Sequence, residues 1–309
     1  MNYNMKVLVA TEKPFSKTAV EGIRRVIEEA GHEFDLLEKY SSPEELRAAA
    51  ATANALIVRS DKVDETLFKA APCLKIVVRA GAGYDNVDLK AASAAGVVVE
   101  NTPGQNSNAV AELVIGLAIM AARNKYSGTT GFEISGKRLG LQAFGQVSRH
   151  VASIAKGFGM EVAAIDPYCP AEAMEKAGVK CAASLEELYA GNDIVSIHIP
   201  ATPETVGSIG RKLIELMPKN AILINTARKE VVNEAELAEV LAARPDIKYV
   251  ADVKPGNADV LVEKFADRVF FTPKKMGAQT AEANLNAGLA AARQIVAFFN
   301  DGTDRFRVN

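Results

Sequence analysis

Residues 140–148 read Gly-Leu-Gln-Ala-Phe-Gly-Gln-Val-Ser, and this stretch decides the fold. An apolar run leads through a glycine into a helical pattern that begins near Gln146, which predicts a strand, a tight turn and a helix. The turn occupies the place of a G-x-G-x-x-G loop but keeps only the middle glycine, Gly145, with Ala143 and Ser148 at the outer positions. The middle glycine lets a backbone approach a pyrophosphate, whose charge a helix N-terminus stabilises.

An acidic residue strengthens this signal. Asp166 stands 21 residues after Gly145, at the end of the next predicted strand, 162–165. A carboxylate there accepts hydrogen bonds from ribose hydroxyls and repels a 2′-phosphate, which favours NAD over NADP. The turn alone fits an ordinary strand–turn–helix equally well. Turn and carboxylate together predict a dinucleotide site, with the pyrophosphate at Gly145, Gln146 and Val147.

Strand and helix patterns alternate along the rest of the chain. Between most of the short apolar runs, apolar residues recur at three- and four-residue spacing, as on one face of a helix. Ser42 and Ser184, each followed by a glutamate three positions later, are predicted helix caps. Because alternating strands and helices require crossover connections, we expect parallel sheets covered on both faces, an α/β fold. The predicted strands are 6–10, 55–59, 75–79, 97–100, 140–144, 162–165, 194–199, 221–226, 249–253 and 269–272.

Two long apolar helices, 108–124 and 280–300, interrupt this alternation and are interpreted as connectors between domains. A length of 309 residues agrees with two domains. The stretch 125–137, after the first connector, predicts no strand. The predicted domains are 1–107 plus 286–309 and, inserted between these segments, 108–285.

Composition argues against several function classes. The 36 basic and 38 acidic residues give a net charge of −2, without the basic surplus of a nucleic-acid or membrane-surface binder. No secretory signal precedes the first strand, and the most apolar stretch, 109–122, is shorter than the roughly 20 residues that cross a bilayer. We therefore expect a cytoplasmic protein with a small-molecule substrate and neither nucleic acid nor membrane as partner. The three cysteines lack the spacing of a zinc site or a disulfide framework: Cys73, Cys169 and Cys181.

Several segments resemble one known family. In their order, and over essentially the whole chain, they are similar to the D-isomer-specific 2-hydroxyacid dehydrogenases, most of all to members that act on 3-phosphoglycerate in serine biosynthesis. The resemblance implies two Rossmann-like doubly wound domains, a split flavodoxin-like substrate domain and an inserted NAD-binding domain, with the active site in the cleft between them. It also implies a homodimer, and no feedback through the C-terminal regulatory domain of longer members. The matching segments are 79–88, 101–103, 111–113, 198–200, 203–205 and 225–228.

The resemblance also assigns residues to the substrate. Arg228 matches the arginine that binds the substrate carboxylate and polarises its carbonyl, a task that suits the fork of guanidinium donors. The backbone N–H groups of Gly81, Ala82 and Gly83 match the loop that holds the carboxylate, where glycine permits close approach.

Two further sets of residues follow from the resemblance. Arg59 with Ser60 matches the place where phosphoglycerate enzymes bind the phosphate, although an arginine at a strand end is equally often only solvated. The positions around the cofactor fall on Ile199, Thr226 and Asp252, the last near the nicotinamide.

Two positions depart from the family pattern. The family places a carboxylate and a histidine downstream of the arginine, and these positions fall on Asn257 and Lys275. One account is a protein that binds NAD without turnover. The other is a coupled change: an ammonium has no tautomer to fix, so lysine in place of histidine relaxes the need for the carboxylate. None of the three histidines obviously substitutes: His32, His150 and His198.

The coupled change is our hypothesis. As a base, Lys275 would have to lower its pKa by a few units from about 10.4, through burial and the charge of Arg228. As the acid in keto-acid reduction it needs no such shift. Lys274 takes this role if the alignment is displaced by one residue. We thus expect an NAD-dependent dehydrogenase of a small D-2-hydroxy acid; the alternatives are an NAD-sensing protein and a dehydrogenase of another acid, such as glycerate or 2-hydroxyglutarate.

Overall fold

The computed structural model describes residues 4–309, which form two compact units. Unit 1 is Met1–Asn106 with Thr280–Asn309, and unit 2 is Ser107–Gln279. The predicted boundary after residue 285 falls inside a continuous helix, α12 (Ala281–Asp301). This helix is capped by the Thr280 side chain at its start and ends at Gly302, which adopts a left-handed φ of 67°.

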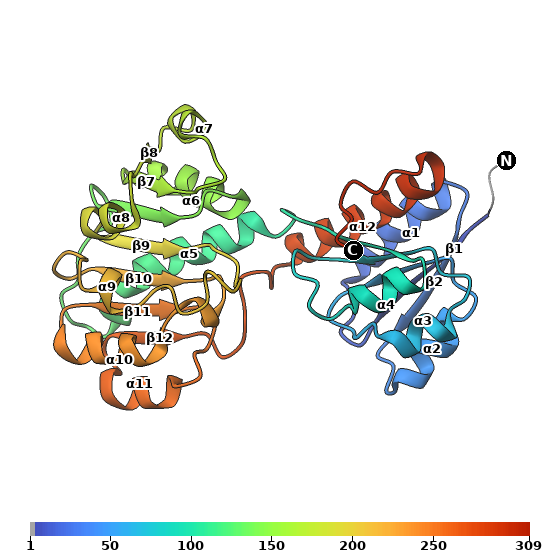
Figure 1. The fold of residues 1–309 in the computed structure, drawn as a ribbon, viewed down its shortest axis with the longest axis horizontal. Helices are drawn as coiled ribbons and strands as arrows, with labels where there is room; N and C mark the ends of the chain where they lie inside the picture. Colours follow the sequence, from blue (N-terminus) through green and yellow to red (C-terminus); the bar gives the residue numbers. More distant parts are fainter. Residues whose placement is uncertain (1–3) are drawn as a thin grey trace. The chain divides into compact units, whose positions relative to one another are not determined.

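Unit 1 is a five-stranded parallel sheet in the order β2-β1-β3-β4-β5, the flavodoxin-like order predicted for the substrate domain. Figure 1 shows helices on both of its faces. The strands are β1 (Lys6–Thr11), β2 (Glu33–Glu38), β3 (Ala55–Val58), β4 (Ile76–Arg79) and β5 (Val98–Asn101). The helices are α1 (Lys17–Glu29), α2 (Pro43–Ala50), α3 (Glu65–Ala70), α4 (Leu89–Ala94) and α12.

Alternation along the strands of unit 1 divides its core into two layers. Leu8 and Leu56 pack with α2, α3 and α4 on one face, whereas Val9 and Ile57 pack with α1 and α12 on the other. Helices α1 and α12 lie in close contact: a Cβ added to Gly288 would stand 2.7 Å from the Ile23 side chain. The C-terminal helix is therefore an integral part of the N-terminal sheet domain.

Unit 2 is a seven-stranded parallel sheet in the order β12-β11-β10-β9-β6-β7-β8. The order reverses between β6 and β9, and in such sheets the crevice at this switch point binds ligands. The strands are β6 (Arg138–Gln142), β7 (Glu161–Ile165), β8 (Lys180–Cys181), β9 (Ile194–Ile197), β10 (Ile222–Asn225), β11 (Lys248–Ala251) and β12 (Val269–Phe271). The α-helices are α5 (Ser107–Ala122), α6 (Gln146–Gly157), α7 (Ala171–Lys176), α8 (Leu185–Gly191), α9 (Arg211–Ile214), α10 (Glu234–Ala243) and α11 (Ala258–Phe265).

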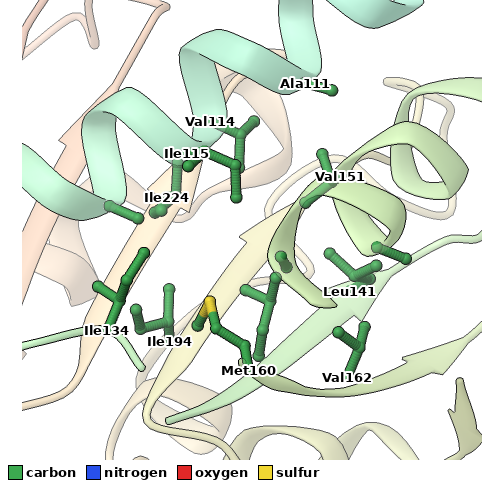
Figure 2. Close-up of a cluster of buried hydrophobic side chains, with 14 of the residues drawn as sticks. Ala111, Val114, Ile115, Ile134, Leu141, Val151, Met160, Val162, Ile194 and Ile224 are labelled. Atoms are coloured by element: carbon green, nitrogen blue, oxygen red, sulfur yellow. The ribbon is translucent and has the colours of Figure 1, made fainter. Parts of the chain in front are cut away.

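Two hydrophobic layers cover this sheet as well. Figure 2 shows the layer beneath α5 and α6, where Val114 and Val151 face the strand residues Leu141 and Ile194. The opposite layer packs α8, α9, α10 and α11 against alternate strand positions such as Val195. Both faces are thus buried, and the functional groups of the sheet are confined to its edges and strand ends. Among residues 4–309, no helix is both long and apolar enough to cross a bilayer.

The structure confirms the α/β class and all ten predicted strands. It adds β2 and β8, which lie at sheet edges. Ser42 and Ser184 cap α2 and α8 as predicted, each accepting a backbone N–H three residues later, over 3.3 and 3.1 Å. The long apolar helices are also confirmed, as α5 and α12.

Candidate active site

The turn between β6 and α6 is open where a ligand would approach it. Gly145 is the N-cap of α6, with φ −78° and no side-chain cap. A Cβ added there would meet no atom within 4 Å. Neither backbone conformation nor packing therefore requires glycine at 145, and the open space there leaves room for a ligand to approach closely. The uncapped N–H groups of the first helical turn, beginning at Gln146 and Val147, suit an anion such as a pyrophosphate.

The two outer positions of the turn, where the nucleotide-binding motif has glycine, are occupied at a local cost. Ala143 adopts φ +84°, a left-handed conformation that disfavours a residue with a Cβ. Ser148 is fully buried, and its hydroxyl has no hydrogen-bond partner in the part of the chain that the structure describes. This local strain agrees with a loop whose shape is set by something other than its own stability.

Asp166 is fixed beside the turn. One carboxylate oxygen accepts the Phe144 N–H over 2.8 Å and the other accepts the Tyr168 N–H over 2.8 Å. A carboxylate has about four acceptor positions, so lone pairs remain for ribose hydroxyls. A direct hydrogen bond thus holds Asp166 beside the turn.

Two buried polar atoms lie just beyond the ends of β9 and β10. The Nε2 atom of His198 and the hydroxyl of Thr226 have no partner among residues 4–309. Burial lowers the pKa of His198 to about 4, so its imidazole is neutral at pH 7. Ile199 follows directly and is half-buried. Buried groups without partners are uncommon and fit a polar ligand at the switch point. With the open turn, these residues fit a dinucleotide.

Arg228 and Lys275 converge on one atom. The guanidinium Nη1 of Arg228 donates to the Ala227 carbonyl oxygen over 3.0 Å, and the Nζ of Lys275 contacts the same oxygen at 3.4 Å. The buried side chain of Asn225 shapes this loop, since its amide donates to the Arg228 carbonyl (2.9 Å) and its oxygen accepts the Ala227 N–H (2.9 Å). Two cationic donors therefore stand together at the carboxyl end of β10. Lys274 is exposed.

Asp252, at the carboxyl end of β11, is fully buried. One of its oxygens accepts the Thr272 hydroxyl (2.9 Å) and the Met276 N–H (2.6 Å), and the other accepts the Gly277 N–H (2.7 Å). The family resemblance implies a place for this residue near the cofactor. Its carboxylate is hydrogen-bonded to the segment around Lys275.

Asn257 is held by a residue outside the predicted set, Glu234 of α10. The Glu234 carboxylate accepts the N–H groups of Gly256 (2.8 Å) and Asn257 (3.1 Å), and its carbonyl accepts the Asn257 amide (3.0 Å). The amide oxygen of Asn257 is buried without a partner in the described part of the chain. The Glu234 carboxylate is therefore occupied by two backbone N–H groups just before α11.

In unit 1, the predicted carboxylate loop leaves two donors available. Gly81 adopts φ +151° and donates its own N–H to the Arg79 carbonyl over 2.8 Å. Its carbonyl accepts the Thr102 N–H (3.0 Å), and the Asn101 amide binds the carbonyl of Ala82 (2.7 Å). The N–H groups of residues 82 and 83 have no partner within residues 4–309. Two of the three predicted backbone donors are thus available to an anion.

Arg59 is anchored at the end of β3. Its Nη1 donates to the carbonyls of Lys13 (2.9 Å) and Pro14 (3.1 Å), and its Nη2 donates to the amide oxygen of Asn284. Of the five guanidinium N–H groups, two remain, on Nε and Nη2. Arg59 is therefore held in place by the protein and can still bind an anion through these two N–H groups. The neighbouring Ser60 is exposed.

A further cation beside the loop was not among the predicted site residues. A Cβ added to Gly81 would fall 1.6 Å from the Nη1 atom of Arg79, so this guanidinium lies directly on the glycine. The Nε of Arg79 donates to the Arg59 carbonyl over 2.9 Å. The signal in the sequence was the arginine next to the Ala-Gly-Ala-Gly run, where a missing Cβ makes room for a large neighbour.

Comparison with known proteins gives one family. Residues 113–273 match the model described as D-isomer specific 2-hydroxyacid dehydrogenase, NAD binding domain. The D-3-phosphoglycerate dehydrogenase of Methanocaldococcus jannaschii is 38% identical over 269 residues, which cover 82% of this chain and 51% of that protein. The enzyme of that name from Archaeoglobus fulgidus is 37% identical, covering 94% and 57%. The chain thus spans about half the length of these curated relatives.

Two comparisons extend over nearly full lengths. The hydroxypyruvate reductase of Thermotoga maritima is 34% identical, with 85% of this chain and 90% of that protein covered. Among solved structures, the NAD+-bound 3-phosphoglycerate dehydrogenase of Entamoeba histolytica is 44% identical, covers 99% of both chains and has a TM-score of 0.88.

Proposed function

Because this chain belongs to the D-isomer specific 2-hydroxyacid dehydrogenase family, we propose that it interconverts a small D-2-hydroxy acid and the 2-keto acid with NAD, with 3-phosphoglycerate and 3-phosphohydroxypyruvate as the leading pair. The observation that carries the proposal is the convergence of Arg228 and Lys275 on the Ala227 carbonyl. Reduction of a keto acid requires from the protein one group that binds the substrate carboxylate and one that transfers a proton.

NAD is the cofactor of this domain family, and when bound it supplies the hydride acceptor or donor. Gly145, Gln146 and Val147 would hold the pyrophosphate, since the turn is open and the helix is uncapped. Asp166 would bind the adenosine ribose. Ile199, Thr226 and Asp252 are the further positions assigned to the cofactor.

At the reacting carbon, Arg228 would bind the substrate carboxylate and stabilise negative charge on the carbonyl oxygen. Lys275 would give its proton to that oxygen during reduction and take it from the hydroxyl during oxidation. An ammonium works without an orienting carboxylate, which agrees with Asn257 at the family's acidic position.

In unit 1, the N–H groups of the loop Gly81, Ala82 and Gly83 would hold the substrate carboxylate. Arg59, with two guanidinium N–H groups still available, would bind a phosphate together with Ser60. The similarity to a hydroxypyruvate reductase supports an unphosphorylated acid as the second candidate substrate.

The decisive experiment is an NADH oxidation assay with glyoxylate, hydroxypyruvate, 2-oxoglutarate and 3-phosphohydroxypyruvate. The native protein should turn over at least one acid, with 3-phosphohydroxypyruvate best, and Lys275→Ala and Lys275→Met should not. NADH binding without turnover of any of the four acids would instead support an NAD-sensing protein on the same fold.

The protein is also proposed to be a cytoplasmic homodimer. Support comes from α5, where Leu113, Ile119 and Met120 are apolar but only partly buried. A second copy would cover them together with the stretch 125–137. Light scattering on the eluting protein should give twice the 32.9 kDa chain mass, and a monomer would refute the assembly.

A further inference from the structure

One side chain, that of Asn225, holds the loop that carries Arg228. Its Oδ1 atom accepts the Ala227 N–H over 2.9 Å, and its Nδ2 atom donates to the Arg228 carbonyl oxygen over 2.9 Å. These bonds fix the first and the third of three successive planar peptide groups. The second group carries the Ala227 carbonyl oxygen, which accepts the Arg228 guanidinium over 3.0 Å. Asn225 therefore determines the position of the oxygen that holds the guanidinium.

Asn225 itself belongs to a rigid element. It is the last residue of β10, the strand between β9 and β11, and it is paired with Ile197 and Ala251 on either side. Arg228, in contrast, has an extended backbone (φ −138°, ψ 142°) just before the 3₁₀ helix η2 (Lys229–Val231). A residue in a loop thus takes its position from the end of a central strand.

The amide group of Asn225 supplies both the donor and the acceptor that this position needs. The side chain is 0% exposed, so a polar atom left without a partner here would be costly. The amide also donates to the hydroxyl of Tyr249, which is buried too, at 3.4 Å. An ionised aspartate could only accept hydrogen bonds. The residue type at 225 is therefore fitted to the loop that it binds.

From these contacts we infer that Asn225 is a positioning residue for Arg228, which it holds so that the guanidinium meets the substrate carboxylate. The inference rests on the proposed function, in which Arg228 binds that carboxylate. A guanidinium binds a carboxylate through two parallel N–H···O bonds, so the direction of its fork matters as well as its charge. Misplacing such a group by about 1 Å costs on the order of 100-fold in rate. Asn225 thus acts on the reaction through Arg228.

The first test is Asn225→Asp, because the new carboxyl group can titrate. Its protonated form has a donor and an acceptor, as asparagine has, whereas its ionised form has no donor for the Arg228 carbonyl oxygen. Burial raises the pKa of such a carboxyl group, so both forms are accessible near neutral pH. Relative to the native enzyme, kcat/KM for the preferred keto acid should lie within about threefold at pH 5.5 and be about 100-fold lower at pH 8.5. Circular dichroism at both pH values establishes that the variant is folded.

Asn192→Asp is the matched control. Asn192 is also buried, at 5% exposure, and its amide also donates to a backbone carbonyl, that of Leu188, over 2.7 Å. It precedes the amino end of β9, so it lies at the opposite end of the parallel sheet from Arg228. Its kcat/KM relative to the native enzyme should be the same at both pH values. An equal loss at pH 8.5 in the two variants would overturn the inference, as would a folded Asn225→Asp whose relative activity does not change with pH.

A second variant, Asn225→Ser, removes the amide without adding a charge and serves if the buried carboxylate prevents folding. If Asn225 acts through Arg228, the losses caused by Asn225→Ser and Arg228→Lys overlap. The double variant should then lose roughly tenfold less kcat/KM than the product of the two single losses. A loss equal to that product would show that the two residues act independently, and would overturn the inference.

Hydrogen exchange provides a readout that does not need turnover. In Asn225→Ser, the amide of Ala227 should exchange faster than in the native protein, while the amides of β10 keep their protection. Unchanged exchange at Ala227 would overturn the inference. Failure of the native protein to reduce any acid would refute the proposed function, and the exchange result would still decide whether Asn225 holds the loop.

Discussion

The guanidinium of Arg228 and the ammonium of Lys275 share one acceptor, the carbonyl oxygen of Ala227, at 3.0 and 3.4 Å. One carbonyl offers two lone pairs, so a single acceptor holds two cationic donors side by side at the carboxyl end of β10. Two cationic donors side by side suit an anionic substrate. A 2-keto acid satisfies this arrangement, with its carboxylate for the guanidinium and its carbonyl oxygen for the ammonium.

Removing the amine should therefore abolish proton transfer. Lys275→Ala and Lys275→Met are expected to lower kcat by roughly 10²- to 10⁴-fold, the usual contribution of general acid–base catalysis. Lys274→Ala is the matched control: it removes an equally exposed neighbouring amine, whereas the contact with the Ala227 oxygen is made by Lys275, so kcat should be nearly unchanged. The measurement is NADH oxidation at saturating keto acid. A reversed result, with Lys274→Ala inactive and Lys275→Ala active, would transfer the role to the adjacent residue.

The second prediction concerns Arg228. Arg228→Lys keeps the charge but loses the two-pronged donor geometry, so kcat/KM for the keto acid should fall by roughly 10- to 100-fold, about 1.5–3 kcal/mol for a bond to a charged group. NADH affinity should be unaffected. Stopped-flow binding of NADH and steady-state kinetics separate the two quantities. Full activity of Arg228→Lys would show that a point charge is sufficient at this position.

The third prediction distinguishes substrate classes at Arg59. Arg59→Ala and Arg59→Gln should raise KM for 3-phosphohydroxypyruvate roughly 10- to 100-fold, through loss of a charge-assisted bond, with hydroxypyruvate changed much less. The glutamine variant keeps an amide donor for the carbonyls of residues 13 and 14, which controls for loss of structure. An equal effect on both acids would instead favour an unphosphorylated substrate.

Much of the fold could be predicted because its signals are local. Short apolar runs and helix caps such as Ser42 depend on neighbouring residues, and all ten strands predicted in this way are present. β2 lacked that signal: its sequence Glu-Phe-Asp-Leu-Leu-Glu has no β-branched residue, and its half-buried edge position tolerates charge. β8 is only two residues long and pairs because β7 is already in place.

The site could be predicted less fully, since its contacts join residues far apart in the sequence. The spacing of Asp166 from Gly145 could be recognised in the sequence, whereas its hydrogen bond with the Phe144 N–H could not. The anchoring of residues 276 and 277 by Asp252 was not predictable either, because it depends on how the ends of β11 and β12 turn. The place of Arg79 on Gly81 depends on side-chain direction, which sequence spacing does not determine.

The fourth prediction contrasts two positions of the nucleotide turn. Gly145→Ala should change the free energy of unfolding by less than about 1 kcal/mol, because the new methyl enters open space, yet weaken NADH binding by steric conflict. Ala143→Gly should instead raise the free energy of unfolding by up to about 1 kcal/mol, because it relieves a left-handed φ of 84°. The added freedom of the unfolded chain reduces this gain. Urea unfolding and NADH titration check both. Unaltered NADH affinity in Gly145→Ala would place the pyrophosphate elsewhere.

The fifth prediction follows from His198, whose pKa burial lowers from 6.5 to about 4. Between these values the unfolded chain binds a proton that the folded chain does not, so stability falls as the pH drops through 6.5 and the loss is complete near pH 4. The contribution is on the order of 2–3 kcal/mol. His198→Asn should remove this part of the pH dependence, whereas His150→Asn, at an exposed histidine, should retain it. Urea unfolding of the three proteins at pH 7, 6 and 5 tests this. Parallel pH profiles for the native protein and His198→Asn would mean that the imidazole gains a proton in the folded state as readily as in the unfolded one.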